Sequence, residues 1–376
     1  MKHSIFFLLL FLSILTKAQF TVRLVVTSVA TKENEAIYLS GNFNNWNPQD
    51  ENYKLKPFGG TRKSIVLKDI AAGNYAFKFT RGENKFECAA DGRDISDRMI
   101  EVNGDMSNEY TIAGWKDNYP DRPKTYSASP QVRILDTAFY IPQLNRTRRV
   151  WVYLPKNYAS VGRAYPVLYM QDGQNLFNEK TAYAAEWGVD DCLDTLQAKL
   201  GKECIVVGID NGGVKRMNEY NPYDHVQYGK GEGKAYVDFI ATTLKPFIDA
   251  KYRTRKGVDY TYVAGSSMGG LISWYALLQY PTVFGGAGIF SPSFWVSPMV
   301  FVDATQFKFE GIPKFYFYVG ALEGPTMVAD MKKLTDILQK KPQFVTRTVV
   351  NPIGQHNETY WRTEFADFYK WMARNW

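Results

Sequence analysis

Two different patterns of hydrophobic and polar positions divide the chain. From residue 19 to about residue 114, apolar and polar residues alternate in short runs separated by clusters of Gly, Asn and Asp. Alternation with a period of two residues predicts half-buried strands, and the regular turn clusters predict a small all-β sandwich. From about residue 131, short apolar runs alternate with longer segments of helical spacing. This second pattern predicts an α/β domain with a mostly parallel central sheet that is covered by helices on both faces.

The second domain, residues 131–376, is expected to alternate strands and helices to its end. We expect strands at Val132–Tyr140, Arg149–Leu154, Pro166–Gln171, Ile205–Asp210, Tyr260–Ala264, Gly286–Phe290, Phe315–Val319 and Val345–Val350. We expect helices at Ala184–Leu200, Gly233–Tyr252, Met268–Tyr280, Thr326–Lys340 and Tyr360–Asn375. The first two strands are expected to form an antiparallel edge. Residues 115–130 are rich in Pro, Ser and charged residues, which predicts a semi-rigid linker after the sandwich at 19–114.

A strand, a tight turn and a helix follow one another around Ser267. The strand Tyr260–Ala264 leads into Gly-x-Ser-x-Gly at residues 265–269, and residues 271–278 continue at helical spacing. In this context the motif predicts a nucleophile elbow that exposes the Ser267 hydroxyl at the carboxyl edge of the sheet. Ser266 is expected to point elsewhere. The alternative is an ordinary turn rich in Gly and Ser.

A serine nucleophile requires a base, and the chain contains three histidines. His3 lies in the apolar N-terminal segment, which leaves His225 and His356. In α/β-hydrolases the order along the chain is Ser, acid, His, so His356, in the loop after the last predicted strand, is the predicted base. His225 is expected at the pocket rim or on the surface.

The acid that orients the base must lie between Ser267 and His356. Glu323 is favoured because it directly follows the strand Phe315–Val319, at the edge where Ser267 is expected. Asp330 is the second choice, although it is expected within a helix. The full set of candidates is Asp303, Glu310, Glu323, Asp330 and Asp336, of which Asp303 and Glu310 are expected in a loop.

Backbone N–H groups near the serine must stabilise the developing oxyanion. We expect one from Met268 and the other from Gln174, in the loop after the third strand of the second domain. Three further residues follow strands at the same edge and are candidate substrate contacts: Asn211, Arg216 and Trp295. Arg216 is expected either to pair with Glu219 or to meet an acidic substrate.

Four segments resemble the esterase-D-type esterases, which include feruloyl and acetylxylan esterases of carbohydrate esterase family one, siderophore esterases and mycolyltransferases. The segments are Tyr165–Phe177, Glu186–Asp190, Gly265–Gly270 and Gly354–Asn357. The resemblance covers residues 131–376 and implies an α/β-hydrolase fold with Ser267 as nucleophile and His356 as base. It places the acid at Glu323, where many members have Asp, and the oxyanion loop at 172–174. Asp172 stands where many relatives have His, and its carboxylate is a candidate acceptor for a sugar hydroxyl.

The segment Tyr38–Pro48, together with Gly73–Phe79, resembles the glycogen- and starch-binding modules of carbohydrate-binding family forty-eight. The resemblance implies that Trp46, Lys78 and Asn108 contact an α-glucan. The second stacking Trp of that family is absent, and Phe86 is the nearest match. The alternatives are that Trp46 fills the sandwich core and that the domain has a structural role.

Composition and charge narrow the function further. Of the 376 residues, 45% are hydrophobic and 22% charged, as in soluble globular proteins. The formal net charge of +7 is scattered along the chain, which argues against nucleic acid as a partner. The three cysteines form no disulfide framework or metal spacing, and we expect no cofactor or metal. Cys192 and Cys204 are expected either to pair or to be free thiols.

Residues 1–18 have the features of a cleaved signal peptide. Lys2 and His3 precede an apolar run that is too short to span a membrane, and small residues precede a cleavage point near Ala18. We therefore expect a secreted or periplasmic protein without membrane insertion.

The leading hypothesis is a metal-independent serine carboxylesterase that acts on feruloyl or acetyl esters of plant polysaccharide. The alternatives are a siderophore trilactone esterase and a non-catalytic polysaccharide-binding protein.

Overall fold

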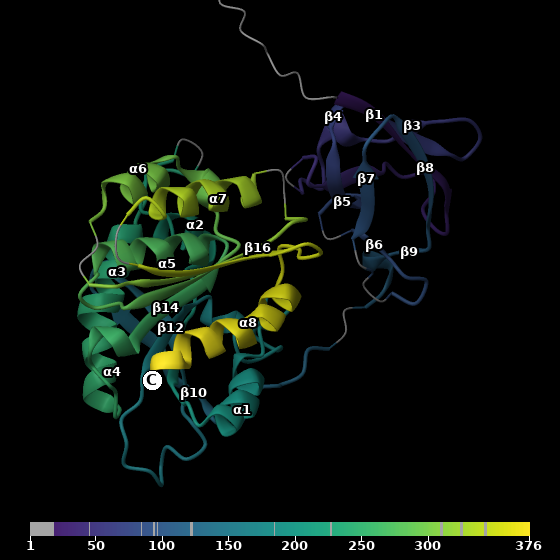
Figure 1. Ribbon diagram of the computed structural model, residues 1–376. Coiled ribbons are helices and arrows are strands. Elements are labelled where there is room, and N and C mark those ends of the chain that lie inside the picture. The colour runs from purple at the N-terminus through teal and green to yellow at the C-terminus, as the bar shows by residue number, and fades with distance from the viewer. Residues whose placement is uncertain are drawn as a thin grey trace, which may run out of the picture. The chain divides into compact units, whose positions relative to one another are not determined.

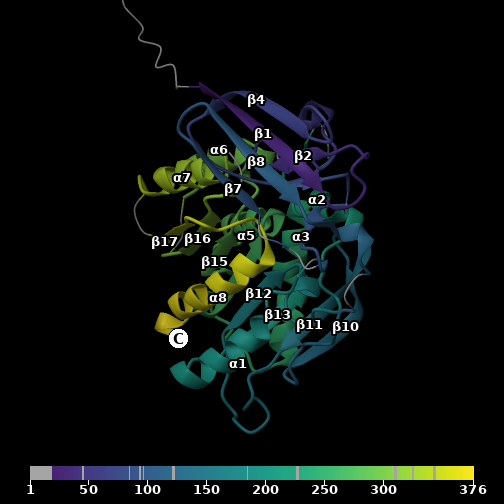
Figure 2. The same cartoon turned by 90° about the vertical axis from the view of Figure 1, so that its right-hand side faces the viewer.

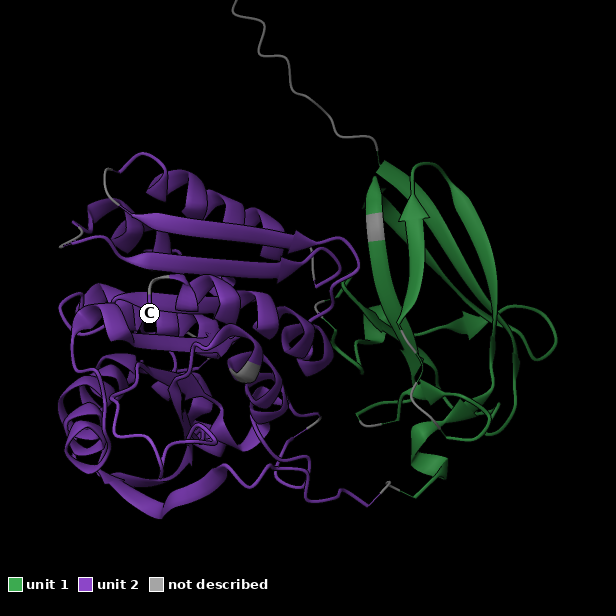
Figure 3. Ribbon diagram, turned by 60° about the horizontal axis from the view of Figure 1, so that its bottom comes forward, with its two compact units in different colours: residues 1–121 green, residues 122–376 purple. Residues whose placement is uncertain are grey.

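The computed structural model describes residues 19–376, apart from residues 45, 84, 93, 94, 96, 121, 122, 184, 226, 227, 309, 310, 324, 325, 342 and 343. The expected signal peptide and the candidate acid Glu310 therefore lie outside the described residues. The chain forms two compact units, residues 1–121 and 122–376 (Figure 3). Among the described residues, no helix has the length and apolar character needed to cross a bilayer.

The first unit consists of two small sheets that share one core. Its strands are β1 (Gln19–Val29), β2 (Tyr38–Gly41), β3 (Lys56–Pro57), β4 (Lys63–Ala71), β5 (Gly73–Thr80), β6 (Glu87–Cys88), β7 (Arg98–Val102), β8 (Met106–Ile112) and β9 (Gly114–Trp115). One sheet has the order β3-β4-β1-β8 and the other β2-β5-β7, while β6 and β9 form a separate pair. Leu24 and Ile65 from the larger sheet and Phe77 and Phe79 from the smaller one are buried in the same cluster. The predicted β-rich first region is confirmed.

The second unit is built on one eight-stranded sheet with the order β10-β11-β13-β12-β14-β15-β16-β17. These strands are β10 (Val132–Ile141), β11 (Arg146–Tyr153), β12 (Val167–Gln171), β13 (Ile205–Ile209), β14 (Thr261–Ser266), β15 (Gly286–Phe290), β16 (Lys314–Gly320) and β17 (Val345–Asn351). The β10–β11 and β11–β13 pairs are antiparallel, and the other pairs are parallel. The predicted parallel sheet with an antiparallel edge is confirmed.

Helices cover both faces of this sheet (Figures 1 and 2). They are α1 (Val189–Leu200), α2 (Arg216–Glu219), α3 (Gly233–Phe239), α4 (Lys245–Lys251), α5 (Met268–Gln279), α6 (Met299–Gln306), α7 (Met327–Leu338) and α8 (Glu358–Met372). Buried residues of α3–α7 pack on one face, and those of α1 and α8 pack on the other. Along β16, Phe315 and Phe317 face the first group, whereas Tyr316 and Tyr318 face the second. Burial of both faces explains why these strands read as apolar runs.

Three helical segments differ in detail from the prediction. The helix expected at 184–200 begins only at Val189. The helix expected at 233–252 is helical from Gly233 to Lys251, but a π-helical segment, Ile240–Leu244, lies between α3 and α4. Helix α6 was expected to be a loop, so Asp303 lies within a helix instead. Only Val300 and Ala304 of α6 are buried, and so few apolar contacts leave a weak periodic signal in the sequence.

A buried carboxylate joins the segment before β10 to helix α1. The backbone N–H of Ser129 donates to Oδ2 of Asp190 at 2.6 Å, and Asp190 is only 1% exposed. Burial raises the pKa of Asp190 to about 6, and the negative charges of Asp191 and Glu186 act in the same direction. Ionisation of this carboxyl therefore costs more in the folded protein than in the unfolded chain.

We expect Asp190→Asn to stabilise the protein at neutral pH. Asparagine keeps an oxygen acceptor for the Ser129 N–H but cannot ionise. The folded pKa of about 6 exceeds the ordinary value of 3.8, so wild-type stability is lost as the pH rises from about 4 to 6. Over that range the advantage of the variant should grow to at most about 3 kcal/mol and then become constant. Urea unfolding at a series of pH values measures this difference. The control is Asp191→Asn, which changes the exposed neighbouring carboxylate. A stability advantage of Asp190→Asn that does not change with pH would contradict the raised pKa of Asp190.

Candidate active site

The turn between β14 and α5 has the geometry of a nucleophile elbow. Ser267 adopts φ 59° and ψ −124°, which is strained for a residue other than glycine. A Cβ atom on Gly265 would lie 2.8 Å from the backbone of Gly269 and from Cγ of Gln171. Only glycine therefore allows the strand and the helix to cross this closely. The strain and the crossing together hold Ser267 at the N-terminus of α5.

The Ser267 hydroxyl lies beside the segment that follows β15. Its Oγ is 3.2 Å from Oγ of Ser293, and the Ser293 backbone N–H donates to the Ser267 carbonyl at 3.1 Å. Met268 is the first residue of α5, so its N–H has no acceptor within the helix. The positive end of the helix dipole therefore lies next to the Ser267 side chain.

Glu323 and His356 meet at the carboxyl edge of the sheet. Oε2 of Glu323 is 3.0 Å from Nδ1 of His356, and the Glu323 side chain is fully buried. The structure thus pairs His356 with Glu323 rather than with Asp330, which lies in the first turn of α7 beside Thr326. Two other candidates have partners elsewhere, since Asp303 accepts from Tyr223 Oη and Asp336 pairs with Lys332.

The second carboxylate oxygen of Glu323 is held by groups that the sequence did not indicate. Its Oε1 accepts hydrogen bonds from the Gly320 N–H and the Ser291 hydroxyl, both at 2.6 Å. Ser291 in turn accepts from Nε1 of Trp361 at 2.8 Å, and the Trp361 ring stands edge-on to His356 at 5.1 Å. These contacts fix both the carboxylate and the imidazole. The available signal for Ser291 was its position directly after β15, at the same sheet edge.

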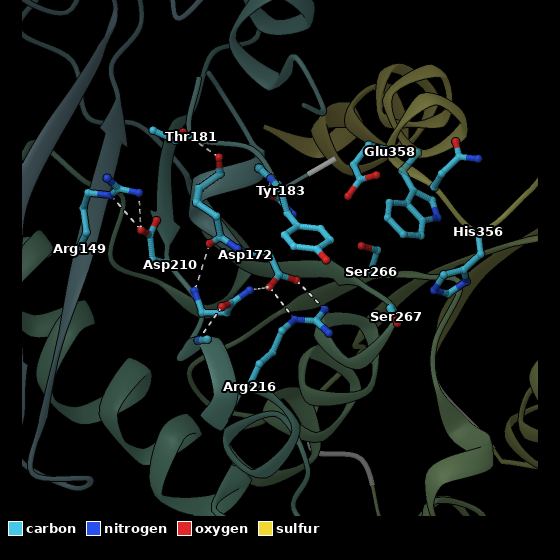
Figure 4. A pocket seen from close by; sticks show the side chains of 16 residues that line it. Arg149, Asp172, Thr181, Tyr183, Asp210, Arg216, Ser266, Ser267, His356 and Glu358 are labelled. Carbon is cyan, nitrogen blue, oxygen red and sulfur yellow. Dashed lines mark hydrogen bonds and ion pairs between the residues drawn. The ribbon is translucent and has the colours of Figure 1, made fainter. Parts of the chain in front are cut away.

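A pocket of about 800 Å³ opens above this edge (Figure 4). It is lined by Arg149, Asp172, Gln174, Asn175, Thr181, Tyr183, Asp210, Asn211, Gly213, Arg216, Ser266, Ser267, His356, Asn357, Glu358 and Trp361. Ser266, which was expected to point elsewhere, therefore also lines the pocket. Trp295, a predicted substrate contact, is not among these residues and is half exposed in the short 3₁₀ helix Phe294–Val296.

The predicted oxyanion loop lies against β13. Asp172 adopts φ 55°, and a Cβ on Gly173 would lie 2.8 Å from the backbone of Gly208 and Ile209. The side-chain Oε1 of Gln174 accepts from the backbone N–H of Asn211 at 3.1 Å. This contact fixes Gln174 in the wall of the pocket that Ser267 also lines.

Both arginines of the pocket are paired with aspartates. Nε and Nη2 of Arg216 donate to the two oxygens of Asp172 at 2.8 and 2.9 Å, and Asn211 Nδ2 donates to Asp172 Oδ1 at 2.7 Å. Nε of Arg149 donates to Oδ2 of Asp210 at 2.8 Å. Burial alone would lower the pKa of Arg216, but the charge of Asp172 outweighs it and raises the pKa. The charges of the pocket wall are therefore largely neutralised within the wall.

The expected pairing of Arg216 with Glu219 is wrong. Glu219 is fully buried and accepts instead from Arg146 at 2.7 Å and from Arg148, both on β11. Arg216 and Glu219 are the two ends of α2, so one end is tied to the sheet while the other reaches the pocket. The register of this short helix decides which carboxylate each arginine meets.

In the first unit, the predicted glycan contacts do not share one face. Lys78 alternates with the core residues Phe77 and Phe79, so it lies on the outer face of its sheet, where it pairs with Asp97 at 3.2 Å. Asn108 lies on the core-facing side of β8, and its Nδ2 donates to Oη of Tyr110 at 3.3 Å. The alternation of the two strands therefore separates Lys78 from Asn108.

Trp46 and Phe86 are both half-buried in the first unit. Trp46 adopts φ 59°, and Phe86 forms a bridge with Thr80. The tryptophan that fills the core is Trp115, which is fully buried, so the suggestion that Trp46 fills it is wrong.

The cysteines and the potential metal-ligating side chains were two further questions raised by the sequence. Cys192 and Cys204 are not joined by a disulfide and are free thiols, which decides between the alternatives left open for them. Among the described residues, no group of three or more His, Cys, Asp or Glu side chains is arranged to hold a metal ion.

The family model described as "Putative esterase" matches residues 141–372. The chain belongs to this esterase family. The match spans strands β11 to β17, the elbow and the Glu323–His356 pair, and it supports ester hydrolysis as the activity.

Similar proteins agree with the family and the fold. The "Uncharacterized protein YbbA" of Bacillus subtilis (strain 168) is 27% identical over 241 residues, 60% of this esterase and 92% of that protein. The "Iron(III) salmochelin esterase" of Escherichia coli O6:H1 is 24% identical over 245 residues, 62% of this chain and 53% of that protein. The crystal structure of an enterochelin esterase from Shigella flexneri matches with a TM-score of 0.55 and 16% identity, over 90% of this chain and 88% of that one.

Substitution Gly265→Ala should destabilise the esterase, because the new Cβ would lie 2.8 Å from the backbone of α5. Overpacking of this kind typically costs about 1–3 kcal/mol. The matched control is Gly162→Ala, because a Cβ at Gly162 would meet nothing within 4 Å. Thermal and urea unfolding of both variants measure the effect, and equal stabilities would show that the elbow tolerates a side chain at 265.

Proposed function

We propose that the chain is a serine carboxylesterase with Ser267 as nucleophile, His356 as general base and Glu323 as the acid that orients His356. The observation that carries the proposal is the 3.0 Å contact between Glu323 Oε2 and His356 Nδ1 in the pocket that also exposes Ser267. With Nδ1 held by the carboxylate, Nε2 of the imidazole remains to accept the serine proton.

The proposed reaction proceeds through an acyl-enzyme. The Ser267 hydroxyl turns from Ser293 toward His356, transfers its proton to Nε2 and attacks the ester carbonyl carbon. The N–H groups of Met268 and Gln174 stabilise the resulting oxyanion, and His356 returns the proton to the departing alcohol. Water activated by His356 then attacks the acyl-enzyme, which releases the carboxylic acid and restores the Ser267 hydroxyl.

The substrates we propose are feruloyl or acetyl esters on plant polysaccharide. The pocket wall supports this choice because its arginines are paired and amide or hydroxyl side chains also line it, including Asn175, Thr181 and Asn211. Such a wall suits a neutral, hydroxyl-rich molecule. We further propose that residues 1–18 direct export, which would bring the enzyme to an extracellular or periplasmic substrate.

A siderophore trilactone esterase is the second candidate. It is favoured by the likeness to the enterochelin esterase of Shigella flexneri, which extends over 90% of this chain. The paired arginines favour it less, because an anionic iron complex would have to compete with Asp172 and Asp210 for them.

Loss of the Ser267 hydroxyl should abolish hydrolysis. For Ser267→Ala we expect a loss in turnover on the order of a millionfold, measured as p-nitrophenol release from the acetyl and feruloyl esters. The proposal is supported if the wild type is active and Ser267→Ala is inactive. The ratio of the wild-type rates on the two esters then shows whether the enzyme prefers acetyl or feruloyl groups. Full activity in Ser267→Ala would place the chemistry elsewhere. If the wild type cleaves neither ester, siderophore lactones are tested next, and inactivity there would leave the non-catalytic polysaccharide-binding alternative.

The orienting acid can be tested separately with Glu323→Gln. Glutamine keeps an oxygen for the Gly320 and Ser291 donors but loses the charge that stabilises the imidazolium, so kcat should fall by about 10⁴ with little change in KM. The matched control is Asp330→Asn, which should retain turnover close to that of the wild type. A larger loss in Asp330→Asn than in Glu323→Gln would reverse the assignment of the acid.

A further inference from the structure

Glu358 is a carboxylate in the pocket that the proposed catalytic groups leave unused. It is the first residue of α8 and lines the pocket together with His356 and Trp361 (Figure 4). The other two pocket carboxylates, Asp172 and Asp210, each accept hydrogen bonds from an arginine. The Glu358 carboxylate accepts a hydrogen bond from its own backbone N–H, and among the described residues no other side chain donates to it. A carboxylate has about four acceptor positions, so acceptor positions remain for a ligand.

The electrostatic surroundings favour a neutral donor over an anion as the partner of Glu358. Burial raises the pKa of Glu358, and the charge of Asp172 acts in the same direction, whereas His356 and Arg216 lower it. A carboxylate accepts strong hydrogen bonds from hydroxyl groups and repels negative charge. Partial burial deprives the Glu358 carboxylate of some of the hydrogen bonds that water would donate. The hydroxyl groups of a ligand would replace them.

Tyr183 presents an aromatic ring at the mouth of the same pocket. The residue is 85% exposed and lines the pocket (Figure 4). Its backbone is nevertheless held at both ends, because its N–H donates to Asn175 Oδ1 at 2.9 Å and its carbonyl accepts from Lys124 Nζ at 3.0 Å. An exposed ring on a fixed backbone offers a flat apolar surface at low entropic cost.

We propose that Tyr183 and Glu358 form the subsite for the sugar ring that carries the ester. The Tyr183 ring stacks on the apolar face of the sugar, and Glu358 accepts hydrogen bonds from its hydroxyl groups. This inference rests on the proposed function and specifies its substrate class, since an aromatic face combined with an unpaired carboxylate matches a neutral carbohydrate. The same carboxylate disfavours a polyanionic siderophore complex.

The test measures how the full mature chain hydrolyses two esters, acetylated xylotriose and p-nitrophenyl acetate. In Tyr183→Ala and in Glu358→Gln, the ratio of kcat/KM for the sugar ester to that for the p-nitrophenyl ester should fall by about tenfold. Unacetylated xylotriose should also become a weaker competitive inhibitor by about the same factor.

Matched controls lie outside the pocket. Asp367→Asn changes a carboxylate on the same helix α8 that pairs with Lys370, and Tyr126→Ala removes a 65% exposed tyrosine that does not line the pocket. Both should keep the wild-type ratio of the two esters. Thermal unfolding of all four variants establishes that they are folded.

Two results would overturn the subsite. One is an unchanged ratio of kcat/KM in both pocket variants, which includes an equal fall in kcat/KM for both esters. The other is a wild type that cleaves p-nitrophenyl acetate but no acetylated xylotriose. Each leaves the serine esterase intact, provided that Ser267→Ala is inactive. Retained activity of Ser267→Ala on both esters would instead overturn the proposed function, so the two failures are distinguishable.

Discussion

The hydrogen bond between Glu323 and His356 is the interaction on which the rest of the site depends. A fully buried carboxylate is tolerated only when it is paired and its oxygens are satisfied. Oε2 of Glu323 meets His356, while Oε1 meets the Gly320 N–H and the Ser291 hydroxyl. Gly320 ends β16, Ser291 follows β15, and His356 follows β17. The orientation of one imidazole therefore depends on how three neighbouring strands end.

The close approach of these strand ends depends on small residues. A Cβ on Gly354 would lie 2.7 Å from Cα of Gly320, so the loop that carries His356 touches the end of β16 directly. Gly265 and Gly173 allow similar contacts at the elbow and at the predicted oxyanion loop. In a parallel sheet the carboxyl ends of the strands lie at one edge, so loops distant in sequence gather there. The glycines decide how close they come.

The pocket wall contains two kinds of polar side chain. Some are charged and paired with one another, and others face the space that a ligand would occupy. Arg149 and Arg216 each form an ion pair with an aspartate. Glu219 of α2 forms ion pairs with two arginines of β11. These partly buried pairs keep the wall in one arrangement, because removal of either partner would leave a poorly compensated charge. Tyr183 and Glu358 differ in that their ring and carboxylate face the open pocket. A rigid wall with few unpaired groups is the arrangement expected for selective recognition.

The sequence by itself determined the alternation of the second unit and the elbow turn, and it singled out His356 as the predicted base. The buried strands are continuous apolar runs, the Gly-x-Ser-x-Gly turn is a local conformational requirement, and only three histidines had to be compared. Helix α6 was not predicted, because few of its residues are buried and its apolar periodicity is weak. The partner of Arg216, the support of Glu323 by Ser291 and Trp361, and the opposite placement of Lys78 and Asn108 were decided by tertiary structure alone. Periodicity and turn preferences act over a few residues and can be read along the chain. The choice of a hydrogen-bond partner depends on which strand ends, helix registers and sheet faces come together, and that is defined only when the whole sheet has formed.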